Sequence, residues 1–141
     1  MTLYDLFVHG EPKGQPRPRA FAFHGKARVY DPGTAEHWKS QIALALPNVI
    51  LKYSGPVRVS LSFYMPRPKH HFTKAGLLKP SSPFAYAKKP DADNLAKAVL
   101  DALTTLGAWD DDAQVATLLI EKWYPVVGNV PGCFIKVETL E

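Results

Sequence analysis

The chain has 141 residues, of which 46% are hydrophobic and 21% are charged. This length predicts one domain, 1–141, and the composition excludes collagen, coiled coils and wholly disordered chains. A single cysteine, Cys133, excludes an internal disulfide and a cysteine-based zinc site. No apolar run approaches the roughly 20 residues of a membrane span, and the start of the chain does not look like a secretion signal. We therefore expect a cytoplasmic protein without a membrane partner.

Charge is unevenly distributed along the chain, whose net charge is +4. Residues 1–90 carry 14 basic and 4 acidic side chains, whereas residues 91–141 carry 3 basic and 9 acidic ones. A nuclease needs this combination, because cations hold the phosphates of DNA and carboxylates hold a metal ion where one phosphate is cut. An ordinary solvated surface would give the same numbers, so charge alone leaves both interpretations open.

The first part of the chain predicts mostly strands. Alternation of apolar and polar residues indicates a strand when it is followed by turn residues, and prolines exclude a helix where they cluster. A threonine after a proline-glycine turn is typical of a helix N-cap. In chain order, the expected elements are a strand at 3–9, an exposed basic loop at 13–19, a hairpin at 21–30 turning at His24-Gly25, a turn at 31–34, a helix from its cap Thr34 to about Leu46, and a half-buried strand at 56–64.

Residues 65–90 follow no helical or strand pattern. They contain five prolines and several lysines, together with the adjacent pair His70-His71. Stretches of this length without regular structure are functional loops or disordered segments. We expect a mobile, basic, proline-rich loop in which both histidines are exposed.

The remainder of the chain predicts one more helix and two strands. Asp93 is the expected N-cap of a helix over 94–106 that stops at Gly107. Strands are expected at 114–124 and 133–140, joined by a turn rich in proline and glycine. The order of all these elements indicates an α+β domain, in which a mixed sheet is covered by two helices.

An acidic cluster surrounds the second helix. Asp91 and Asp93 are expected in its extended entry with both carboxylates facing one side, and Lys97 and Asp101 follow along its polar face. Aspartates 110–112 begin the returning strand and would converge with the entry if that strand pairs beside it. Such a site suits Mg²⁺, which takes few protein oxygens besides water and substrate phosphates. Structural roles also remain open, namely helix capping, solvation and an ion pair of Lys97.

The segment 88–115, KKPDADNLAKAVLDALTTLGAWDDDAQV, resembles the signature of the RusA family of Holliday junction resolvases. Both the D-x-D-N-L-x-K-x-x-x-D-A-L core and the W-x-D-D-A-Q-V close are present at the family's spacing. The segment GQPRPR at 14–19 and the region of Tyr30, Pro32 and Trp38 are also similar to that family. The resemblance covers nearly the whole chain and is weakest over 65–90.

This resemblance implies a RusA-like fold and a homodimeric, Mg²⁺-dependent endodeoxyribonuclease. Such a hydrolase resolves four-way junctions by paired symmetric cuts during DNA recombination and repair. Mn²⁺ is expected to replace Mg²⁺, and no organic cofactor is expected. By motif position, the resemblance implies catalytic roles for Asp91, Asp93, Asp112 and Lys97, and metal binding by Asp91, Asp93, Asp112 and Asp111, while Asp110 stays outside the site. The side chains expected to bind DNA phosphates are Arg17, Arg19, Lys69, Lys74, Lys79, Lys88 and Lys89.

Two other functions remain possible from the sequence. One is a nuclease that acts on flaps or other branched DNA in phage replication, which needs the same chemistry and differs only in surface geometry. The other is a non-catalytic DNA-binding module in which the aspartates only cap a helix and form ion pairs. The second alternative predicts that Mg²⁺ is dispensable and that Asp91→Asn leaves function intact.

Overall fold

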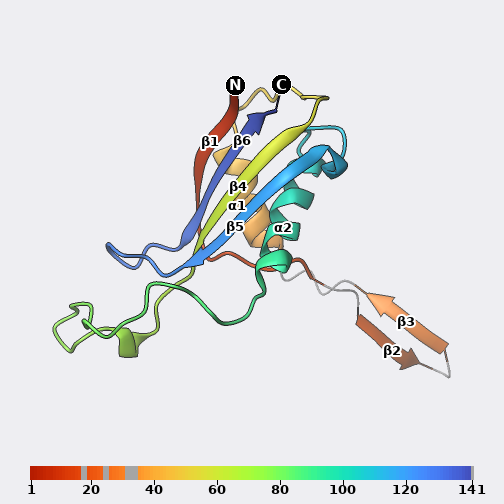
Figure 1. Ribbon diagram of the computed structural model, residues 1–141. Coiled ribbons are helices and arrows are strands. Elements are labelled where there is room, and N and C mark those ends of the chain that lie inside the picture. The colour runs from red at the N-terminus through yellow and green to blue at the C-terminus, as the bar shows by residue number, and fades with distance from the viewer. Residues whose placement is uncertain (17–18, 24–25, 31–34, 141) are drawn as a thin grey trace.

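The fold is a four-stranded mixed sheet with two helices on one face, beside a separate two-stranded sheet (Figure 1). The computed structural model describes the backbone of residues 1–16, 19–23, 26–30 and 35–140, and the side chains of 1–16 and 35–140. The predicted α+β class is confirmed. The elements are β1 (Thr2–His9), β2 (Arg19–Phe23), β3 (Lys26–Tyr30), α1 (Glu36–Ala45), β4 (Val57–Tyr64), the short 3-10 helix η1 (Lys69–His71), α2 (Ala92–Thr105), the 3-10 helix η2 (Asp112–Gln114), β5 (Val115–Trp123) and β6 (Gly132–Thr139).

The main sheet has the strand order β1-β6-β4-β5. β6 runs antiparallel to both of its neighbours, whereas β4 and β5 are parallel. Parallel neighbours need a long crossover connection, and α2 lies in that connection. Although β5 and β6 are consecutive in the chain, they are not neighbours in the sheet, because β6 inserts between β1 and β4.

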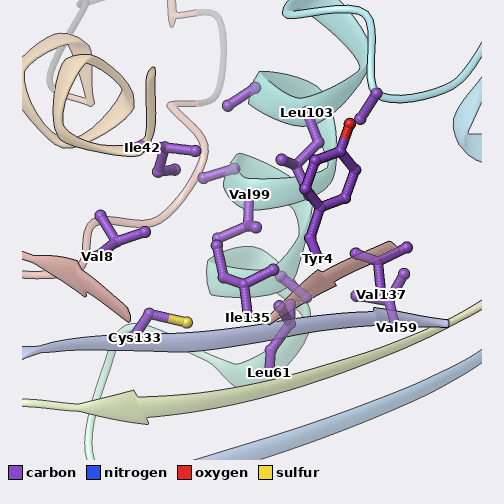
Figure 2. Packing of buried hydrophobic residues seen from close by; sticks show 14 of the residues in the cluster. Tyr4, Val8, Ile42, Val59, Leu61, Val99, Leu103, Cys133, Ile135 and Val137 are labelled. Carbon is purple, nitrogen blue, oxygen red and sulfur yellow. The ribbon is translucent and has the colours of Figure 1, made fainter. Parts of the chain in front are cut away.

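The hydrophobic core lies between the sheet and the two helices (Figure 2). β4 supplies the alternation expected of a half-buried strand, since every second side chain from Val57 to Phe63 is fully buried. Burial of each such aliphatic or aromatic side chain contributes about 1.5–3 kcal/mol to folding. Each helix packs one apolar face against the sheet. The buried residues of these faces include Trp38 and Ile42 from α1, and Leu95, Val99 and Leu103 from α2.

The helix starts differ from those expected. α2 begins at Ala92, so Asp91 is its N-cap and Asp93 lies inside its first turn. α1 begins at Glu36 with Ala35 at the N-cap position, while the expected cap Thr34 and its turn 31–34 lie outside the described residues. The hairpin is confirmed as β2 and β3, and its turn at 24–25 also lies outside the described residues. Gly107 ends α2 as expected, in the left-handed region with φ of 87°.

The loop 65–90 is ordered around a buried cation, which corrects the expectation of a stretch without structure. Arg67 is 5% exposed and donates from Nε to the Pro125 carbonyl and from Nη1 to the Pro83 carbonyl, each at 2.8 Å. His71 is buried as well, with its ring 4.9 Å from that of Tyr124, so the expected exposure of both histidines is wrong for this one. The guanidinium satisfies carbonyls that a proline-rich segment cannot pair in a ladder.

None of the helices in the described part of the chain combines the length and the apolar composition that crossing a bilayer requires.

Acidification is expected to destabilise the packed loop through His71. Burial lowers the pKa of His71, and the nearby charges of His70, Arg67, Lys88 and Lys79 lower it further. The unfolded chain takes up the proton near the ordinary histidine pKa of about 6.5, whereas the folded chain takes it up only at lower pH. The stability that neutral His71 contributes is therefore complete above about pH 6.5 and is lost as the pH falls toward the lowered pKa.

Urea unfolding of wild type and His71→Gln at about pH 7.5 and about pH 5.5 measures this difference. The variant should lose less stability between the two pH values than wild type does. The matched control is His70→Gln, because His70 is the exposed neighbour. An equal loss in wild type and His71→Gln would show that His71 does not carry the effect.

Candidate functional site

The first acidic group lies at the start of α2. Asp91 has extended backbone angles at the N-cap, and its side chain makes no capping hydrogen bond. Asp93 is exposed in the first helical turn, so the expectation that both aspartates lie in the extended entry is wrong. Both carboxylates nevertheless lie at the positive end of the helix dipole. Capping of the helix therefore does not occupy the Asp91 carboxylate.

The N-terminal loop packs against this acidic entry. The backbone N–H of Gln15 donates to the backbone carbonyl of Asn94 at 3.1 Å. A Cβ added at Gly14 would clash with Nδ2 of the Asn94 side chain. A cavity of about 520 Å³ opens beside these residues and is lined by Lys89, Pro90, Asp91 and Asn94. Gly14 therefore allows a close approach of the backbone, which brings Gly14 and Gln15 to the start of α2.

The polar face of α2 carries Lys97 and Asp101, both exposed as expected. Asp101 accepts a hydrogen bond from the Lys39 ammonium of α1 at 2.8 Å. Lys97 forms no ion pair within 4.0 Å with any residue that the structure describes. The alternative role of Lys97 as an ion-pair partner therefore finds no support among these residues.

The second acidic group lies where η2 leads into β5. Asp111 has a structural role, because its carboxylate accepts a hydrogen bond from the Ala113 amide at 2.8 Å in a capping box with Gln114. Asp110 forms an exposed ion pair with Lys52 at 3.4 Å. Asp112 is exposed and takes part in neither contact. Of the three successive aspartates, Asp112 is thus the one that takes part neither in the capping box nor in an ion pair with a described residue.

The charges around Asp112 come from its neighbour Asp111 and from the polar face of α2. Desolvation, a hydrogen bond with Asp111 and the negative charges of Asp111 and Asp101 raise the pKa of Asp112, and the positive charge of Lys97 opposes this rise. The interactions with Lys97 and Asp101 place Asp112 beside the polar stripe of α2.

Within one chain, the two acidic groups do not converge. The Lys122 ammonium donates to the Pro90 carbonyl at 2.9 Å, which places the entry of α2 beside the end of β5. The 3-10 helix η2, which begins at Asp112, leads into β5. The start of β5 lies toward the other end of α2, a helix about 20 Å long (Figure 1). Among the described residues, no group of three or more His, Cys, Asp or Glu side chains could hold a metal ion. The predicted convergence required the returning strand to start beside the entry of α2. It does not, because β5 pairs parallel to β4 and starts far from that entry.

The predicted DNA-binding cations divide into two groups. Those of the loop 65–90 are exposed, and two of them directly precede the acidic entry. Arg17 lies outside the described residues, and only the backbone of Arg19 is described, at the first position of β2. The exposed cations are Lys69, Lys74, Lys79, Lys88 and Lys89.

Three residues at the site were not singled out from the sequence. Gln15 and Asn94 join the N-terminal loop to α2, and Lys122 holds the backbone before Asp91. Asn94 lies within the D-x-D-N motif, and Gln15 follows the glycine of GQPRPR, so both had a local signal. Lys122 had none, because its contact joins residues 32 positions apart.

Comparison with known proteins gives consistent results. The profile of the family described as "Endodeoxyribonuclease RusA" matches residues 9–138. The uncharacterized protein YqaN of Bacillus subtilis is 36% identical over 136 residues, which cover 88% of this chain and 89% of that protein. The crossover junction endodeoxyribonuclease RusA of Escherichia coli K12 is 26% identical over 109 residues, covering 76% of this chain and 75% of the relative. With a match across nearly its whole length, the chain belongs to the RusA family of endodeoxyribonucleases.

Proposed function

We propose that the protein is a homodimeric, Mg²⁺-dependent endodeoxyribonuclease that resolves four-way DNA junctions by paired symmetric cuts. The observation that carries the proposal is the division of the acidic residues into two groups along α2, beside the edge strand β5. Family membership supports the nuclease chemistry. The Escherichia coli relative is named as a crossover junction enzyme, which supports the substrate and a role in recombination and repair.

The edge strand β5 is suited to pairing with a second copy. β4 occupies one side of β5. On the other side, among the residues that the structure describes, the segment Phe84–Tyr86 pairs with the last residues of the strand only. Leu118 is 41% exposed and Leu119 is 55% exposed. Uncovered apolar edges are templates for strand addition, and a two-fold axis makes such pairing antiparallel. The start of one β5 then lies beside the end of the other.

This pairing would bring the two acidic groups together across the dimer. Asp91 and Asp93 of one protomer would face the partner's Asp112, with the partner's Asp111 next to it. Carboxylates of this number suit Mg²⁺, which also takes water and substrate phosphate oxygens. When bound, Mg²⁺ supplies an activated water and offsets charge that develops at phosphorus. Two equivalent sites related by a two-fold axis match the near two-fold symmetry of a four-way junction.

The remaining polar residues serve the DNA. Lys97 is four residues beyond Asp93 on the exposed face of α2, where its ammonium would hold the scissile phosphate and stabilise its developing charge. Lysines of the loop 65–90 would bind phosphates of the junction arms without reading bases. Because Arg67 fixes this loop to the β5–β6 connection, these cations project from an anchored segment.

Cleavage of a synthetic four-way junction, compared with a linear duplex of the same sequences, tests the proposal. Wild type should make paired nicks in the junction alone with Mg²⁺, and none with EDTA. Asp93→Asn should bind the junction and not cut it, because one metal-binding carboxylate is lost while the cations remain. Cutting of flaps in preference to junctions would favour the branched-DNA alternative. Binding without any cutting by wild type would favour the non-catalytic module.

Mixing two inactive variants should restore cleavage. Asp91→Asn and Asp112→Asn should each be inactive alone, since each homodimer has both sites damaged. A mixed dimer pairs the intact Asp91 of one protomer with the intact Asp112 of the other, which leaves one complete site. After random exchange of subunits, about a quarter of the sites should be complete, and junctions should receive single nicks.

The control for this mixing experiment is a mixture of Asp91→Asn with Asp93→Asn. Both substitutions then lie in the same half of the site, and no dimer contains a complete one. Equal recovery in both mixtures, or none in the first, would mean that the aspartates do not act across the dimer.

Loss of a loop lysine should weaken junction binding and its dependence on salt. Lys79→Ala is expected to flatten the slope of log affinity against log salt concentration by about 0.9, the value for one phosphate contact. Binding titrations at several salt concentrations measure that slope. The control is Lys136→Ala, since Lys136 lies on β6 and is close to Glu138 instead. An unchanged slope in Lys79→Ala would remove this residue from the DNA-binding surface.

A further inference from the structure

Lys122 is the penultimate residue of β5, and its ammonium binds backbone rather than carboxylates. Nζ donates to the Lys88 carbonyl at 2.8 Å and to the Pro90 carbonyl at 2.9 Å. The Pro90 carbonyl belongs to the peptide group that joins directly to Asp91. Lys122 thus holds both ends of the three-residue turn that delivers the chain to the acidic entry of α2.

The same stretch of chain is bound to the end of β5 by further contacts. The Tyr86 amide donates to the Lys122 carbonyl at 3.1 Å, and the Tyr124 amide donates to the Phe84 carbonyl at 2.7 Å. The Tyr86 hydroxyl donates to the Lys89 carbonyl, and Lys122 Nζ lies 5.3 Å from the centre of the Tyr86 ring. Cations at this distance from an aromatic face are attracted to it. Two of these contacts involve Lys122 itself, and they add to the two hydrogen bonds by which its ammonium anchors the turn.

Proline explains why an anchor is needed at this place. Pro90 has no N–H group, so its own amide cannot hold the turn to a neighbouring strand. The carbonyls of Lys88 and Pro90 can still accept hydrogen bonds, and an ammonium group has three N–H donors for them. Fixing the Pro90 carbonyl fixes the peptide plane before Asp91, and with it the direction in which the Asp91 side chain leaves the backbone.

A role in DNA binding fits Lys122 less well. Lys88 and Lys89 are exposed, whereas Lys122 is half-buried. Two of its three donors already bind carbonyls, and the ring of Tyr86 lies beside it. Binding a phosphate would require these contacts to break.

We propose that Lys122 is a positioning residue for the nuclease reaction. It holds the backbone of the turn 88–90 so that the Asp91 carboxylate is presented in a fixed place. The inference rests on the proposed function for its effect on cleavage, although the anchoring itself is a property of the chain. Misplacement of a reacting group by about 1 Å costs up to about 100-fold in rate, which sets the size of the expected effect.

The test compares Lys122→Met, which keeps the length of the side chain but has no donor, with Lys122→Arg, which keeps donors and charge. Hydrogen exchange of the peptide segment 84–94 reports on the anchoring without any activity. Junction binding without Mg²⁺ and junction cleavage with Mg²⁺ are measured on the same samples. Lys136→Met is the matched control, because it removes a lysine from β6 on another part of the sheet.

In Lys122→Met, the backbone amides of 84–94 should exchange hydrogen faster than in wild type, and amides elsewhere should exchange at an unchanged rate. The variant should bind the junction within about twofold of wild type and cut it about 10- to 100-fold more slowly. Lys122→Arg should recover most of the lost rate, and Lys136→Met should resemble wild type throughout. Unchanged exchange over 84–94 in Lys122→Met would overturn the anchor.

Other outcomes separate the competing explanations. A loss of binding in Lys122→Met with a flatter salt slope, and no loss of cleavage once the junction is bound, would make Lys122 a phosphate contact and overturn the proposal. If wild type cuts no branched DNA, the proposed function fails. Faster exchange over 84–94 in Lys122→Met would then still support the anchor, and unchanged exchange would still refute it.

Discussion

Parallel pairing of β4 with β5 is the constraint on which the arrangement of the acidic residues depends. Parallel neighbours cannot be joined by a tight turn, so the chain returns along the sheet through α2 before β5 begins. The start of α2 therefore lies near the end of β5, and Asp112 lies before the start of β5. One chain presents two acidic groups instead of one, and the proposed dimer is the symmetric arrangement that would join them.

Two cations order the irregular part of the chain by binding carbonyls. Arg67 joins the loop 65–90 to the β5–β6 connection, and Lys122 joins the end of that loop to β5. Both act in segments where prolines remove amide donors, so that side chains replace the backbone ladder. As a result, the exposed lysines of the loop 65–90 project from an anchored segment. The turn that precedes the carboxylates of Asp91 and Asp93 is anchored as well.

The local parts of the site were predictable from the sequence, and the contacts between distant parts were not. The polar stripe of Lys97 and Asp101 follows from helical periodicity, which depends only on residues in the same helix. The sequence places the start of α2 too far along the chain, at Asn94 instead of Ala92, because Asp91 and Asp93 are both suitable N-caps. Only the backbone angles distinguish them. His70 and His71 are adjacent in the sequence, but His71 is buried against Tyr124 whereas His70 is exposed.

The sequence by itself determined the α+β class, the buried alternation of β4, the apolar face of α2 and membership of a nuclease family. Each of these depends on periodicity or on a motif within a short segment, where neighbours in the chain are neighbours in space. Only the tertiary structure decided that Asp112 lies apart from Asp91, that Arg67 is buried, and that Lys122 holds Pro90. These features depend on which strands pair and in which direction, and strand pairing is a non-local choice that no short pattern encodes.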